Sequence, residues 1–155
     1  MQYNYKYLYT VNIETNSVEY LDPRLHRHFL TFAISTPNNA TQEFMFSSWL
    51  QRHFSNTVQR FAPKLLTLVP AIVLASMTLH QRLCTVFQPT ANKFLYGFNL
   101  RDVAALFKGL LLSTPETVTS SLQVLRLWAH EAHRVYSDRL NEENDINIFR
   151  KVLTD

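Results

Sequence analysis

Two segments near the N-terminus have the side-chain pattern of β-strands. Residues 3–13 alternate with period two, with tyrosine and aliphatic side chains on one face and mostly polar side chains on the other. Residues 29–35 are apolar at most positions, which is typical of a strand buried on both faces. Two strands alone are marginally stable. We therefore expect this end of the chain to belong to a sheet whose other strands lie outside it.

From Ala40 onward the apolar positions recur at helical spacing. Pro70 suits the first turn of a helix, Pro89 ends that helix, and Asn99 is a favourable N-cap for the next one. The predicted helices begin near residues 40, 70, 99, 120 and 144. Their predicted inner faces include Val86, Leu122 and Leu125. The predicted fold class is α+β and mainly α, with two strands of an incomplete sheet followed by an α-helical bundle.

The composition excludes several classes of protein. Glycine occurs only twice, so neither GxxxxGK[ST] nor GxGxxG can be written with this sequence. The single cysteine excludes a disulfide framework. A net charge of +3 is too small to indicate a nucleic-acid partner, and the most apolar window, residues 65–79, is shorter than the roughly 20 residues that span a bilayer. We expect neither nucleic acid nor a membrane as partner.

Histidine pairs at 26/28 and 130/133 suggest a metal site, but no thiol pair or HExxH motif accompanies them. Cys84 lies in an apolar helix, where a thiol behaves as a small hydrophobic group. We therefore expect neither a metal ion nor a nucleophile.

Four polar residues are more specific candidates. Arg24 and Arg27 lie just before the second predicted strand, Arg101 lies in the first turn of the helix that Asn99 caps, and Asn12 ends the first predicted strand. Each has a plain alternative. The first two arginines can be solvated charges, Asn12 can be a turn residue, and Arg101 can pair with a carboxylate, either Asp102 or Glu131.

The order of these features resembles the second half of an AAA+ ATPase module, and the match is closest to the dynein heavy chain family, at its third AAA+ module and in an axonemal, outer-arm-like form. The segments that carry the resemblance are residues 22–29 (DPRLHRHF), 98–102 (FNLRD), 109–111 (GLL), 125–131 (LRLWAHE) and 134–140 (RVYSDRL). The resemblance implies that the two strands belong to an AAA+ α/β sheet and that the helices form its lid.

The resemblance also implies roles for the four candidates. Asn12 matches the sensor-1 position, although residues 13–17 (IETNS) replace the Pro and Gly-containing loop that usually follows it. Arg27, or Arg24 as second choice, matches the arginine finger that reaches in trans to the nucleotide of the preceding module. Arg101 matches the sensor-2 arginine, which contacts the nucleotide of its own module. ATP or ADP with Mg²⁺ would be bound in the parent module.

The resemblance further implies that the Walker A and Walker B segments lie upstream of Met1, so the isolated chain should neither hydrolyse ATP nor need a cofactor. Residues 1–54 would then end the large subdomain, 55–143 would form the lid, and 144–155 would begin the connection to the next module. The implied partners are neighbouring AAA+ modules of the same heavy chain and, through the parent, microtubules and other dynein chains. The implied location is the cytoplasm and cytoskeleton, in a ciliary or flagellar axoneme. The alternative is a free-standing helical protein-interaction module without ATPase activity.

Overall fold

The computed structural model describes Arg24, residues 27–56 and residues 61–154. The chain divides after Thr36 into two parts, residues 1–36 and residues 37–155, and each is described by itself. The first predicted strand, residues 3–13, lies outside the described residues.

The strand predicted at residues 29–35 is wrong, because these residues form neither strand nor helix. The apolar side chains expected to be buried are exposed, Leu30 to 82%, Phe32 to 76% and Ile34 to 92%. A strand needs a neighbour that accepts and donates its backbone hydrogen bonds. Within the described residues the only β pairing is an isolated bridge between Thr90 and Lys93, so no sheet is present there to bury this segment.

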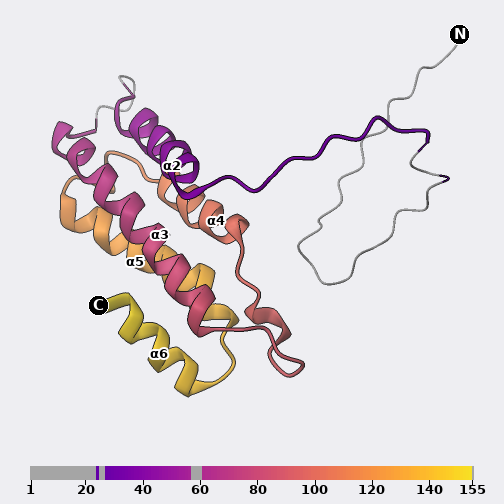
Figure 1. Ribbon diagram of the computed structural model, residues 1–155. Coiled ribbons are helices and arrows are strands. Elements are labelled where there is room, and N and C mark those ends of the chain that lie inside the picture. The colour runs from indigo at the N-terminus through magenta and orange to yellow at the C-terminus, as the bar shows by residue number, and fades with distance from the viewer. Residues whose placement is uncertain (1–23, 25–26, 57–60, 155) are drawn as a thin grey trace, which may run out of the picture. The chain divides into compact units, whose positions relative to one another are not determined.

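The second part of the chain is a helical bundle, as the sequence predicted (Figure 1). Its α-helices are α2 (Asn39–Phe54), α3 (Val69–Val86), α4 (Leu100–Leu111), α5 (Ser121–Tyr136) and α6 (Glu143–Thr154). Three short 3-10 helices accompany them, η1 (Pro63–Leu68), η2 (Phe94–Tyr96) and η3 (Ser137–Arg139). The mainly helical fold class is thereby confirmed.

Local chemistry explains where these helices begin. The side chain of Asn38 accepts from the backbone N–H of Thr41 at the start of α2, and Pro70 occupies the first turn of α3, where its missing N–H costs nothing. Asn99 is the N-cap of α4 and Ser120 is the N-cap of α5, and each forms a reciprocal capping box. The predicted cap at Asn99 is therefore confirmed.

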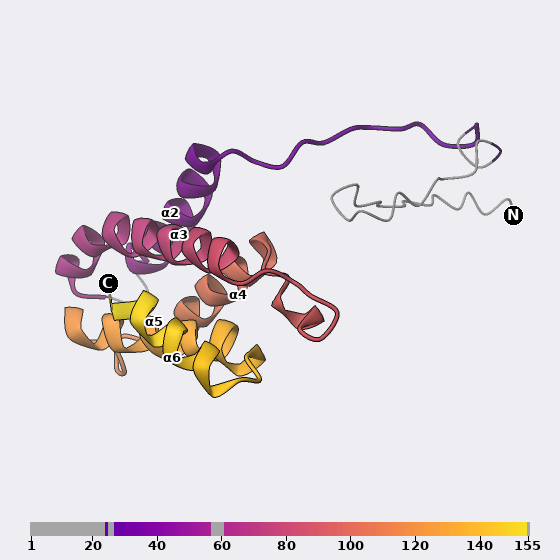
Figure 2. The same ribbon diagram turned by 60° about the horizontal axis from the view of Figure 1, so that its bottom comes forward.

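Helix α3 lies in the middle of the bundle and packs against α2, α4 and α6 (Figure 2). Together with η1 it forms a stretch, Pro63–Val86, that is long and apolar enough to cross a membrane by length and composition alone. Its residues Ile72, Val73 and Leu83 are buried against the other helices. This packing is that of a core helix of the bundle.

Helix α4 is the second central element, in contact with α2, α3 and α5. The rings of Phe46 on α2 and Phe107 on α4 stack with centroids 4.5 Å apart and planes 12° from parallel. Burying an aromatic or aliphatic side chain of this size stabilises the fold by about 1.5–3 kcal/mol. The buried residues of α4 run from Asp102 to Leu110, so the core contacts the helix over most of its length.

Three residues predicted on inner faces are exposed. Val86 is exposed because α3 ends there and Phe87, in extended conformation, turns inward to meet Tyr96. Leu122 and Leu125 are exposed because Val124 occupies the buried position in the first turns of α5. The buried face of α5 then continues through Glu131, a charged residue that an apolar pattern cannot include.

Candidate functional site

The structure places two of the four predicted site residues in the first part of the chain. Arg27 is exposed, and its Nε donates a hydrogen bond to Nε2 of His28 at 3.1 Å. Arg24 is also exposed. Asn12 lies outside the described residues. The roles implied for these three residues stay predictions.

Arg101 lies in the first turn of α4, and its side chain is exposed. The Asn99 side chain accepts from the backbone N–H of Arg101 at 2.9 Å, so the cap fixes the backbone at this residue. Both carboxylates considered as its partners are engaged elsewhere, Asp102 with Arg139 and Glu131 with Arg134. Among the described residues the Arg101 guanidinium has no hydrogen bond or ion pair, so it is available to an anionic ligand.

The charge of Asp102 also acts on a partly buried polar network of His80, Cys84 and Tyr136. The Tyr136 hydroxyl lies 3.2 Å from Nδ1 of His80, and Nε2 of the same ring lies 3.6 Å from Sγ of Cys84. Burial lowers the pKa of His80, and the negative charge of Asp102 partly opposes that shift. Burial, reinforced by Asp102, raises the pKa of Cys84, and burial also raises that of Tyr136. The thiol is therefore kept neutral, which matches its predicted behaviour as a small hydrophobic group.

A second polar cluster joins the loop before α4 to α6. Nζ of Lys93 contacts Glu142 at 2.7 Å and Asp145 at 2.6 Å, and the Tyr96 hydroxyl donates to Asp145 at 2.8 Å. The two carboxylates raise the pKa of Lys93, and the hydrogen bond from Lys93 lowers that of Asp145. Sequence reasoning missed this cluster because Lys93 and Tyr96 are each 49 residues or more from their partner carboxylates.

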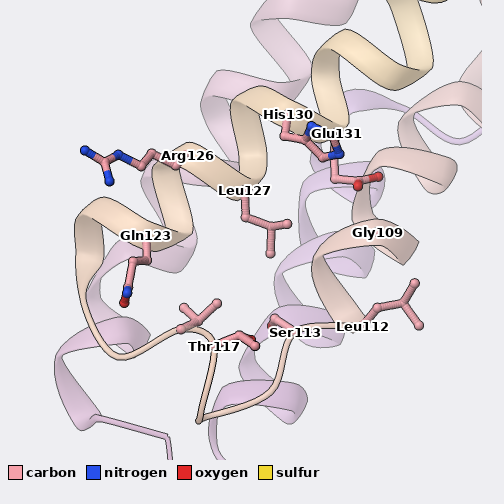
Figure 3. A pocket seen from close by; sticks show the side chains of 10 residues that line it. Gly109, Leu112, Ser113, Thr117, Gln123, Arg126, Leu127, His130 and Glu131 are labelled. Carbon is pink, nitrogen blue, oxygen red and sulfur yellow. The ribbon is translucent and has the colours of Figure 1, made fainter.

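A groove of about 550 Å³ lies at the other end of α4 (Figure 3). Its walls are the end of α4 at Gly109 and Leu112, the loop that follows, and α5 from Gln123 to Glu131. Figure 3 shows Arg126 and His130 on its α5 wall. The groove therefore does not include Arg101, which belongs to the first turn of α4.

Metal-binding geometry is not found in the described part of the chain, where no group of three or more His, Cys, Asp or Glu residues is placed to hold an ion. Of the predicted histidine pair on α5, His130 lines the groove. His133 instead packs edge-on against Phe149, with ring centroids 5.0 Å apart.

Comparison with known proteins identifies the bundle. Residues 72–155 match the family model described as AAA+ lid domain. Dynein axonemal heavy chain 11 of Sus scrofa is 40% identical over 84% of this chain, and Dynein axonemal heavy chain 17 of Mus musculus is 38% identical over 97% of it. Dynein alpha chain, flagellar outer arm, of Chlamydomonas reinhardtii is 36% identical over 86% of it.

The chain spans about 3% of the length of each of these curated relatives. The family match covers more than half of the chain and includes all of α4, α5 and α6 and nearly all of α3. The chain therefore belongs to the AAA+ lid domain family and is similar, over most of its length, to a segment of axonemal dynein heavy chains.

Proposed function

We propose that this chain is the lid of an AAA+ module in a dynein heavy chain, and that Arg101 on α4 contacts the nucleotide of that module. The observation that carries the proposal is the exposed guanidinium of Arg101, without an intramolecular partner among the described residues, beside a rigidly capped helix start. An arginine in this state can bind phosphate oxygens through charge-assisted hydrogen bonds.

The module is the third of the heavy chain, and it binds ATP or ADP with Mg²⁺. The lid completes this nucleotide site but contains no phosphate-binding glycine loop of its own. Arg27, with Arg24 as second choice, reaches the nucleotide of the preceding module. Asn12 acts as the sensor-1 residue. The boundaries at residues 54 and 143 belong to the same proposal.

The wider role follows from the relatives, whose names place them in axonemes, cilia and flagella. The partners are then neighbouring AAA+ modules of the same heavy chain, and, through the parent protein, microtubules and other dynein chains. The location is the axonemal cytoskeleton. A free-standing interaction module is not favoured, since the similarity to motor heavy chains extends over 84–98% of this chain.

The test uses a dynein heavy chain that carries this segment. Arg101→Ala should weaken nucleotide binding at the module by about tenfold or more, the loss expected for a hydrogen-bonded charge. Lys108→Ala is the matched control, because Lys108 is an exposed cation in the last turn of the same helix. Arg27→Ala should instead act on the module before it. Unchanged nucleotide affinity and unchanged microtubule motility in both arginine variants would contradict the proposed roles.

Calorimetry on the isolated chain gives an independent check. With millimolar ATP or ADP and Mg²⁺ we expect no binding, because a phosphate-binding loop is missing from this sequence. A micromolar dissociation constant would show that the chain forms a nucleotide site alone and that its role is not merely to complete one.

A further inference from the structure

The carboxylate of Asp102 is buried, with only 4% of the residue exposed, and its two oxygens have different partners. Oδ2 accepts the backbone N–H of Asn99 at 2.8 Å and closes the capping box. Oδ1 accepts a hydrogen bond from Nη2 of Arg139. One carboxylate therefore holds the start of α4 and also binds a residue 37 positions further along the chain.

Arg139 lies in η3, directly after α5, and it contacts both sides of the Asn99 cap. After the cap it pairs with Asp102. Before the cap its guanidinium lies over the ring of Phe98, with Cζ 5.9 Å from the ring centroid. The turn that leads into α4 is thus fixed from outside by the end of α5.

We infer that Arg139 is a positioning residue for Arg101, an inference that rests on the proposed nucleotide contact of Arg101. By neutralising Asp102 and fixing the Asn99 turn, Arg139 leaves the guanidinium of Arg101 free to meet the phosphates. It also makes the nucleotide contact depend on how the end of α5 is packed against the start of α4.

The position of Arg101 depends on Arg139 because of the buried charge of Asp102. Without Arg139, Asp102 would be a buried carboxylate lacking a cation, a state that costs free energy and is relieved by water or by the nearest free cation. Arg101 directly precedes Asp102 in the sequence, but adjacent residues of a helix point in different directions. Pairing Arg101 with Asp102 would therefore unwind the first turn of α4. Whether water or Arg101 relieves the charge of Asp102, we expect Arg101 to leave its position.

Hydrogen exchange on the 155-residue chain tests the structural half of this inference. Arg139→Gln should speed exchange of the Asn99 and Arg101 amides by about tenfold, because both amides are held by the capping box that Asp102 closes. Arg134→Gln is the matched control, since Arg134 also pairs with a buried carboxylate of this bundle but is absent from the cap. Equal exchange at these two amides in both variants would overturn the inference.

A double-mutant cycle in a heavy chain carrying this segment tests the functional half. With Arg101 present, Arg139→Gln should weaken nucleotide binding by about five- to tenfold, whereas in the Arg101→Ala background it should weaken binding less than twofold. Arg139→Lys should recover part of the affinity, because it restores the charge but not the planar fork, and it serves as the second variant if Arg139→Gln does not fold.

The outcomes separate the two ideas. If Arg101→Ala alone changes nothing, the proposed nucleotide contact fails and the inference fails with it. If Arg101→Ala weakens binding but Arg139→Gln does not, or acts equally in both backgrounds, the nucleotide contact stands and the positioning role of Arg139 is wrong. A merely structural role for Arg139 would not produce the dependence on Arg101.

Discussion

The two ends of α4 each place a buried carboxylate against an arginine, but they use the pair differently. At the first turn, Asp102 pairs with Arg139, which belongs to η3, directly after α5. At the last turn, Glu131 of α5 lies over Gly109 and pairs with Arg134, three residues away on its own helix, at 2.6 Å. The first pair therefore joins separate elements, whereas the second is made within one helix.

The difference shows what a buried ion pair contributes to a lid of this kind. The Glu131–Arg134 pair joins residues three apart on α5, which are already neighbours, and Arg134 reaches α4 through a long hydrogen bond, 3.4 Å, from Nη2 to the carbonyl of Ala105. A pair between elements fixes their relative position, and it is the one that lies beside Arg101. The first turn of α4 is therefore the end that an ion pair joins to another element.

The largest effect should come from removing the carboxylate that joins the elements. Asp102→Ala breaks the capping box and leaves Arg139 without its partner, so we expect it to lower the free energy of unfolding by about 2–3 kcal/mol. Glu131→Ala should cost less, about 1 kcal/mol or below, because Arg134 is half exposed and regains water. Urea denaturation of the 155-residue chain measures both. Equal losses would show that the two ends are not different in this respect.

A substitution at Gly109, in the last turn of α4, should have an intermediate effect on the free energy of unfolding. A methyl group there would overlap the carboxylate of Glu131, which packs directly on the glycine. Gly109→Ala should therefore lower the free energy of unfolding by about 1 kcal/mol, even though alanine favours a helix over glycine by a similar amount.

The effect of Gly109→Ala on the free energy of unfolding should change sign when the side chain of Glu131 is removed. In the Glu131→Ala background, Gly109→Ala should stabilise the chain by about 0.5–1 kcal/mol, the ordinary gain of helix propensity. The same urea titration, carried out as a double-mutant cycle, measures this change. A Gly109→Ala effect of the same sign in both backgrounds would mean that Glu131 does not determine the need for glycine.

Helix starts were predictable from the sequence because their signals are local. Asn99 with Asp102 three residues later is a capping box, and Pro70 is compatible only with a first turn, so each boundary is encoded in a few adjacent residues. The predicted strand at residues 29–35 failed for the opposite reason. Strand formation depends on a partner strand, and an apolar run in the sequence does not show whether one is present.

The chemistry around Arg101 was only half predictable. Its place in a capped first turn follows from adjacent residues, but the sequence left Asp102 and Glu131 open as its partners. Both carboxylates are in fact occupied, Asp102 by an arginine 37 residues away and Glu131 by one only three residues away. The first partner could not be inferred because no local spacing relates Asp102 to Arg139. The partner of Glu131 could have been inferred from the i, i+3 spacing of Glu131 and Arg134. The pattern of apolar residues in α5, however, gave no reason to expect Glu131 to be buried.

The smallest expected effect is a pH dependence, which also distinguishes the two ends. His80 lies near Asp102, and His53 lies 3.1 Å from the Ser113 hydroxyl just after α4. Burial lowers the pKa of both from the ordinary value of 6.5, so the unfolded chain binds protons more readily than the folded chain as the pH falls. Stability should therefore be full above that value and be lost progressively as the pH falls through the folded-state pKa.

Urea denaturation between pH 7.5 and pH 5 measures this loss. His80→Gln and His53→Gln should each make it shallower, while His130→Gln, at an exposed position, is the control. Asp102→Asn should make the loss steeper, because the carboxylate that partly supports the charged form of His80 is gone. This steepening should disappear when His80→Gln is added but persist when His53→Gln is added. If both histidine variants removed the steepening equally, Asp102 would influence the two ends of α4 alike, and the distinction between a first turn linked to Arg139 through Asp102 and a last turn outside the influence of Asp102 would not hold.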